Sequence, residues 1–225
     1  MALWYFTRAS GAASLVLLTA TLVLGVVDVG RWTSPRFPRF VTDALHRTVS
    51  LLVVVFVALH VLTAVLDTFA PVRLPDAVVP FGSAYRPLWL GLGAMAFDLL
   101  LALVVTSLLR ARLGMRTWRV VHWTAYACWP LALVHGLGSG SDVRSGWMLW
   151  LSIGCAGVVA LAVLVRAGAA ASEGLALAWS VGALAVAGLA LAVWLPSGPL
   201  ARGWASKSGT PPALVKPAAR NGASP

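Results

Sequence analysis

A chain of 225 residues that is 60% hydrophobic and only 11% charged, with a mean hydropathy of +0.87, is too apolar for an ordinary soluble domain. Its net charge of +10 comes from basic residues at the ends of apolar segments and after Pro196. Such residues are typical contacts of anionic lipid headgroups. They form no basic folded face, which excludes a nucleic-acid-binding protein.

Apolar segments long enough to cross a bilayer recur along the chain. Only Arg8 precedes the first of them, which favours a retained span over a cleaved signal peptide. The sequence predicts an all-α membrane domain over residues 1–195, followed by a disordered Pro-, Ala- and Gly-rich basic tail over 196–225. We expect a bundle of six transmembrane helices, at residues 12–29, 45–67, 88–110, 117–137, 147–166 and 174–195.

Arginines gather mostly on one side of this predicted bundle. The opposite side has fewer basic residues near its span ends, apart from those of the tail. Because short cytoplasmic loops carry an excess of Lys and Arg, we place loops 1 and 3 in the cytoplasm. We expect an integral protein of the bacterial plasma membrane with both termini outside. The loops after spans 1, 3 and 5 carry Arg31, Arg36, Arg39, Arg47, Arg110, Arg112, Arg116, Arg119 and Arg166.

All four histidines of the chain lie in predicted spans 2 and 4, which run in the same direction. His46 and His60 are 14 residues apart, and His122 and His135 are 13 apart, or about 21 Å and about 20 Å along a helix. In a hydrocarbon core of about 30 Å, these spacings place one histidine pair in each leaflet at matching depths. His46 and His122 would lie near the cytoplasmic side, and His60 and His135 nearer the outside.

Two imidazoles that face each other at one depth suit a metal held between parallel helices. Neutral imidazole binds iron, and a haem would fill the apolar gap between the helices. The alternatives are four unrelated histidines bonded to backbone carbonyls, or a zinc site, which normally needs clustered ligands. Thirteen residues leave His135 about 140° from His122 on an ideal helix, so we expect a kink at Pro130 to turn it back.

The pattern H-x13-H on one span and H-x12-H two spans later resembles the haem-bearing membrane domain of ferric reductases and NADPH oxidases. The segment "LLRARLGMRTWRVVHWTAYACWPLALVH" (108–135) is also similar to the haem subunit of the bacterial periplasmic methionine-sulfoxide reductase system. This resemblance implies two haem b groups, an inner one on His46 and His122 and an outer one on His60 and His135.

Iron with two axial histidines has no vacant position, so we expect an electron-transfer subunit of an oxidoreductase, with no catalytic residues of its own. Flavin- and nicotinamide-binding domains usually follow in the resembled family, and we expect no such site here. "GLGAMA" (91–96) matches a dinucleotide-binding pattern, but no strand precedes it, and we interpret its glycines as helix-packing positions. The electron donor is then a separate flavoprotein, docked on the arginines of loop 3, or a membrane quinol.

Three arginines, one aspartate and two alternative functions complete the predictions from the sequence. Arg47, Arg116 and Arg119 lie near the inner pair, where they would neutralise haem propionates or contact lipid phosphate. Asp98 lies well inside a span and would bond a neighbouring helix or carry a proton. The alternative functions are a quinol-linked cytochrome b subunit, or a haem-free membrane transporter or scaffold.

Overall fold

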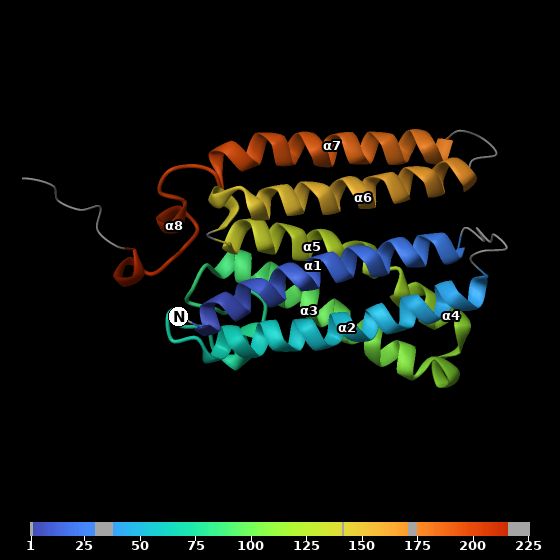
Figure 1. Ribbon diagram of the computed structural model, residues 1–225, viewed down its shortest axis with the longest axis horizontal. Helices are drawn as coiled ribbons and strands as arrows, with labels where there is room; N and C mark the ends of the chain where they lie inside the picture. Colours follow the sequence, from blue (N-terminus) through green and yellow to red (C-terminus); the bar gives the residue numbers. More distant parts are fainter. Residues whose placement is uncertain (1, 30–37, 141, 171–174, 216–225) are drawn as a thin grey trace, which may run out of the picture.

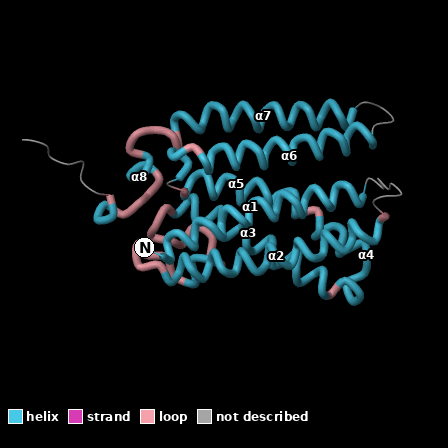
Figure 2. The backbone as a smooth tube through the Cα atoms, in the orientation of Figure 1, coloured by secondary structure: helices cyan, strands magenta, loops and turns pink. Residues whose placement is uncertain are grey.

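The computed structural model describes residues 2–29, 38–140, 142–170 and 175–215. These residues form helices and connecting turns, and no strand occurs among them (Figure 2). The prediction of an all-α chain is therefore confirmed. Four basic residues lie outside the described residues, namely Arg31 and Arg36 of loop 1 and Lys216 and Arg220 of the tail.

Five helices are long and apolar enough to cross a membrane. These helices contain few charged residues and are rich in Leu, Val and Ala. A spanning helix satisfies its own backbone hydrogen bonds, which lipid cannot do. The protein is thus an integral membrane protein. The five helices are α1 (Ala2–Val29), α2 (Arg39–Leu66), α3 (Pro87–Leu108), α6 (Trp147–Ala170) and α7 (Leu175–Ser197).

The predicted fourth span, 117–137, is not one helix. It is divided between α4 (Arg110–His122) and α5 (Ala125–Ser139). At about 1.5 Å per residue, the 15 residues of α5 reach about 22 Å, which is short of a hydrocarbon core of about 30 Å. The prediction of six long spans is therefore met by five long helices among the described residues, while the fourth span is two shorter helices, of which α5 carries the chain from the α4 end to the opposite end inside the bundle.

The arginines of α4 explain this division. Four of its 13 residues are arginine, all exposed, and the helix is bent at Gly114, whose φ of 77° is left-handed. Such a segment is too polar for the hydrocarbon region and suits the membrane surface. In Figure 1, α4 lies at one end of the bundle, and we call this the α4 end.

The helices lie side by side with their axes roughly aligned (Figure 1). Helix α1 packs against α2, α5 and α6, and α3 packs against α5. Helix α7 packs on α6 at the edge of the bundle. The order of the chain makes α1 and α3 antiparallel to α2 and α5, so α2 and α5 run the same way, as the sequence predicts for spans 2 and 4.

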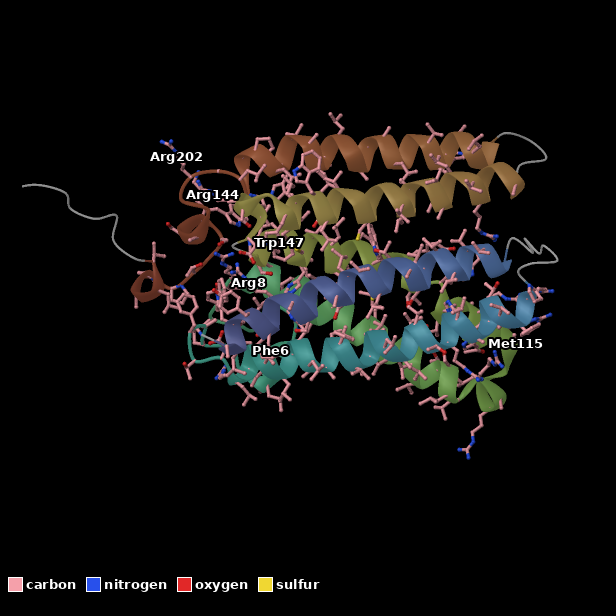
Figure 3. All side chains as sticks on the ribbon, viewed as in Figure 1. Phe6, Arg8, Met115, Arg144, Trp147 and Arg202 are labelled. Carbon is pink, nitrogen blue, oxygen red and sulfur yellow. The ribbon has the colours of Figure 1, made fainter. Side chains whose placement is uncertain are left out.

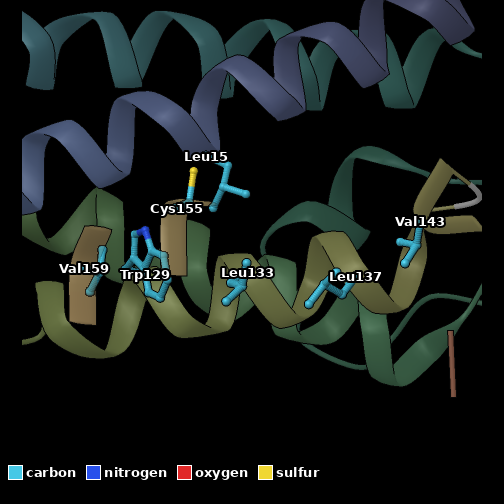
Figure 4. Packing of buried hydrophobic residues seen from close by; sticks show 7 residues of the cluster. All are labelled: Leu15, Trp129, Leu133, Leu137, Val143, Cys155 and Val159. Carbon is cyan, nitrogen blue, oxygen red and sulfur yellow. The ribbon is translucent and has the colours of Figure 1, made fainter. Parts of the chain in front are cut away.

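A core of buried apolar side chains joins α1, α5 and α6 (Figure 4). Positions four residues apart share one helix face, and α5 uses such positions to fill the space between its neighbours. The indole Nε1 of Trp129 donates a hydrogen bond to Thr19 Oγ1 at 2.9 Å, which satisfies the polar atom of this buried tryptophan. The cluster consists of Leu15, Trp129, Leu133, Leu137, Val143, Cys155 and Val159.

The tail differs from the expected disordered segment as far as residue 215. It carries α8 (Trp204–Lys207) and a short 3-10 turn, Pro212–Leu214, and it folds back on the end of the bundle opposite α4 (Figure 1). Trp204 Nε1 donates to the carbonyl of Gly138 at 3.0 Å. Figure 3 shows Arg8, Arg144 and Arg202 at this tail end and Met115 at the α4 end.

Arg86 is the reason that the tail stays in place. Its guanidinium donates Nη1 to the carbonyls of Gly138 and Ser139, at 3.2 and 2.7 Å, and Nε to Thr210 Oγ1 at 2.9 Å. The carbonyls at a helix C-terminus attract a cation, and here they belong to the last turn of α5. Burial lowers the pKa of Arg86 from its usual value, although a guanidinium stays protonated in proteins. One buried cation thus joins α3, α5 and the tail.

Candidate functional site

The four histidines lie between the helices in two pairs. The first pair is His46 with His122, whose ring centres are 6.3 Å apart, and the second pair is His60 with His135, at 6.2 Å. The two rings of each pair are strongly inclined, at 62° and 81°. The structure therefore brings together the residues that the spacing of the sequence predicts at matching depths.

The separations of the ring centres suit one metal ion between two imidazoles. Metal–imidazole bonds are about 2.0–2.1 Å long and a ring nitrogen lies about 1.1 Å from its ring centre, so two rings on opposite sides of one ion have centres about 6.3 Å apart. Two imidazoles joined by a direct hydrogen bond would have centres only about 5.1 Å apart. Both pairs match the first arrangement and not the second.

Backbone carbonyls of α1 orient both histidines of α2. His60 Nδ1 lies 2.8 Å from the carbonyl oxygen of Thr7, and His46 Nδ1 lies 3.1 Å from that of Thr21. A carbonyl can only accept, so each Nδ1 carries the proton. The lone pair is then on Nε2, which is the arrangement in which a histidine ligand is held for a metal.

Helix α3 orients His135 in the same way, through the carbonyl of Trp89 at 2.8 Å. In all three cases a glycine follows four residues after the carbonyl and leaves room for the ring. A Cβ would lie 3.0 Å from the His60 ring at Gly11, 3.4 Å from the His46 ring at Gly25, and 2.5 Å from His135 Nδ1 at Gly93. The prediction that the glycines of "GLGAMA" are packing positions is confirmed for Gly93, which lies inside α3.

We call a backbone carbonyl that bonds a histidine ring, together with the glycine four residues later that leaves room for that ring, a glycine–carbonyl cradle. Sequence reasoning missed this cradle, although α1 carries a signal for it. The pattern T-x3-G occurs at residues 7–11 and again at 21–25, an offset of 14 residues. The same offset separates His46 from His60 on the antiparallel α2. Equal spacing on two antiparallel helices predicts two repeated contacts, one at each depth.

His122 is held differently from the other three histidines. Its Nδ1 is buried and has no hydrogen-bond partner among the residues that the structure describes. Its ring instead stacks on the indole of Trp118, with 4.7 Å between centres and 26° between planes. His122 is the last residue of α4, so it occupies a helix end, whereas His135 lies within α5.

The break between α4 and α5 brings His122 and His135 toward one face. Backbone hydrogen bonds from Thr124 to Val121 and from Tyr126 to Trp123 are of the i to i+3 kind. A 3-10 turn advances each residue by about 120°, against about 100° in an α-helix, so two or three such residues recover about 40–60° of the missing rotation of about 140°. The expected change of phase is therefore found at 123–124 and not at Pro130, through which α5 continues.

A cavity of about 320 Å³ lies beside the second pair, and α1, α2, α3 and α5 line it with mainly apolar side chains. Arg8 and Asp142 line the cavity and form an ion pair at 2.7 Å, which places a paired arginine near His60 and His135. An apolar cavity with two opposed imidazoles and one cation fits a haem, whose macrocycle supplies the other four iron ligands.

The remaining predicted site residues lie apart from the histidine rings. Arg47, Arg116 and Arg119 are exposed at the α4 end, on the same end of the bundle as the first pair. Asp98 is half-buried in α3, and no hydrogen bond or ion pair joins its carboxylate to another described residue. Within the described ranges, no three His, Cys, Asp or Glu side chains gather as a metal site, so the histidines meet only in twos.

Residues 10–133, more than half of the chain, match the family described as ferric reductase-like transmembrane component. The chain belongs to this family. The match includes His46, His60 and His122 and ends two residues before His135. No curated protein and no solved structure matches the chain. The expected resemblance is thus confirmed, and it supports haem binding and transmembrane electron transfer with a separate redox partner as the class of function.

Proposed function

We propose that this ferric reductase-like protein carries electrons across the membrane through two haem b groups. The first haem would be held by His46 and His122, and the second by His60 and His135. The observation that carries this proposal is the separation of the ring centres, 6.3 and 6.2 Å, in two pairs stacked along one bundle. Three of the four rings also have Nδ1 engaged by a carbonyl, which leaves Nε2 for iron.

A bound haem supplies an iron couple that takes up and releases one electron at a time. With two histidines on each iron, the chain would leave no vacant iron position for a substrate. The mainly apolar side chains around the second pair would limit how far the surroundings rearrange when the iron changes its charge. Arg8 and Asp142 both line this cavity, so an ion pair would lie beside the second haem.

The distribution of arginines supports cytoplasmic placement of the α4 end. There the arginines of α4 are exposed, together with Arg39 and Arg47. At the tail end the exposed basic residues are fewer, namely Arg144, Arg202 and Lys207, because Arg8 and Arg73 form ion pairs with aspartates and Arg86 is occupied by backbone carbonyls. Free basic charge near span ends marks the cytoplasmic side. Both described chain ends, which lie at the tail end, would then be outside.

Electrons would enter at the first haem and leave from the second. The donor we propose is a separate flavoprotein with an acidic surface, since the exposed arginines of α4 form a basic surface next to His122. Arg47, Arg116 and Arg119 would also neutralise the propionates of the first haem. A membrane quinol is the alternative donor, and reduction of the haems by quinol alone would favour it.

The test is substitution of each histidine, with Thr63→Ala on α2 as the control. We expect His46→Ala and His122→Ala to remove one and the same component of a redox titration. His60→Ala and His135→Ala should remove the other component, and Thr63→Ala should remove neither. Paired behaviour of His46→Ala with His135→Ala would contradict the proposed ligation.

A further inference from the structure

His122 is the one histidine of the four whose Nδ1 has no hydrogen-bond partner among the described residues. Its ring is in contact with Trp118, at 4.7 Å between centres and nearly parallel. The indole is fixed in turn, because its Nε1 donates to Ser107 Oγ at 3.2 Å, near the end of α3. The guanidinium of Arg110 lies over the indole, 5.5 Å from its centre.

We propose that Trp118 is a positioning residue for His122, and that the stack of Arg110, Trp118 and His122 couples the basic surface of α4 to the first haem. This inference rests on the proposed function, because it concerns how one of the proposed iron ligands is held. It assigns to an indole the task that a backbone carbonyl performs for the other three histidines.

The bend of α4 makes the stack possible. In an unbroken helix, residues eight positions apart lie about 12 Å apart along the axis, too far for Arg110 to cover Trp118. Gly114 has a left-handed φ of 77° and a ψ of 157°, which interrupts the helix between the two residues. No other atom lies within 4 Å of the position that a Cβ of Gly114 would take, so the glycine is required by its backbone conformation.

The contacts define what each member of the stack does. A face-to-face contact fixes the plane of the imidazole, whereas a hydrogen bond to Nδ1 would fix its direction. Ser107 holds the indole against α3 and so keeps the stack in register. Arg110 adds a positive charge over the indole face, a favourable cation–π arrangement. A cation near the iron favours the reduced, less positive form, and thus raises the midpoint potential of the first haem.

The decisive experiment compares Trp118→Leu with Trp118→Phe and Trp123→Leu in the full chain with both haems bound. The matched control is Trp123, because it follows His122 directly but is 69% exposed. We expect Trp118→Leu to shift the midpoint potential of the first haem and to change its low-spin electron paramagnetic resonance signal. Trp118→Phe, which keeps an aromatic face, should restore both, and Trp123→Leu should change neither. The second haem should be unaffected throughout.

Two milder variants test the same inference where Trp118→Leu fails to fold. Ser107→Ala should shift the first haem as Trp118→Leu does, by a smaller amount. Arg110→Gln should lower the midpoint potential of the first haem, while the exposed Arg112, changed to Gln, should not. Equal potentials in Trp118→Leu and Trp123→Leu, or an unshifted first haem in both Ser107→Ala and Arg110→Gln, would overturn the inference. Absence of haem from the wild-type protein would instead refute the proposed function.

Discussion

A single methyl group at Gly93 tests the cradle of the second histidine pair. A Cβ added to the backbone of α3 at this position would lie 2.5 Å from His135 Nδ1 and 2.6 Å from its Cε1. Ordinary contacts of a Cβ begin at 3.4 Å, so the ring must retreat by about 0.9 Å. The same ring atom is the one that bonds the Trp89 carbonyl at 2.8 Å, and it cannot retreat without losing that bond.

The energetic cost follows from these contacts. Inserting a methyl group into packed surroundings costs about 1–3 kcal/mol, and the lost hydrogen bond adds about 1 kcal/mol. The higher helix propensity of Ala returns only about 1 kcal/mol. Loss of a partner that orients a histidine ligand lowers metal affinity by about 10–100-fold. We therefore expect Gly93→Ala to lose much of the second haem while keeping the first.

The assay is haem content per chain together with a redox titration of each component. Gly25→Ala is the graded comparison, since its Cβ would lie 3.4 Å from the His46 ring, and we expect it to keep both haems. Gly188→Ala, with no atom within 4 Å, controls for the added methyl group itself. A Gly93→Ala protein with the haem content and potentials of Gly188→Ala would refute the reasoning.

Three further predictions concern the tail, the core and the partner. Arg86→Gln should destabilise the packing of the tail by about 3 kcal/mol and expose the tail to protease. Arg202→Gln, on an exposed residue, should do neither, and equal cleavage of the two variants would show that Arg86 does not hold the tail. Trp129→Phe should lower the free energy of unfolding by about 1 kcal/mol through loss of the bond to Thr19, and an unchanged value in a denaturation series would count against that bond. Reduction by a soluble flavin reductase should slow as salt rises, and neutralising the arginines of α4 should remove this dependence; rates insensitive to salt would exclude electrostatic docking.

The histidine pairs could be predicted because depth in a membrane follows directly from residue count. Spacings of 14 and 13 residues on two parallel helices fix the partners before any side-chain contact is known. The position of the phase change could not be predicted in this way. Pro130 is the visible helix-breaking residue, yet the helix changes pitch at 123–124, where no proline or glycine marks it.

The structures of the tail and of α4 also could not be predicted from the sequence pattern. Composition predicts disorder after Pro196, but one buried cation, Arg86, gives the tail a binding place 124 residues away in sequence. A contact between residues so far apart in the chain produces no periodic pattern in the amino-acid sequence. The hydropathy of residues 117–137 predicts one long span there, which combines the end of the amphipathic α4 with the apolar α5. The arginines before His122 indicate that the first part of this segment is polar. The positions of single arginines therefore indicate where the membrane span begins better than the mean hydropathy of the segment does.

The haem content of the purified wild-type chain tests most directly whether each of the two histidine pairs holds one haem. A haemochrome assay should give close to two haem b per chain, and the native protein reduced with dithionite should give a low-spin spectrum typical of two nitrogen ligands. A colourless chain purified from haem-replete cells would contradict the account.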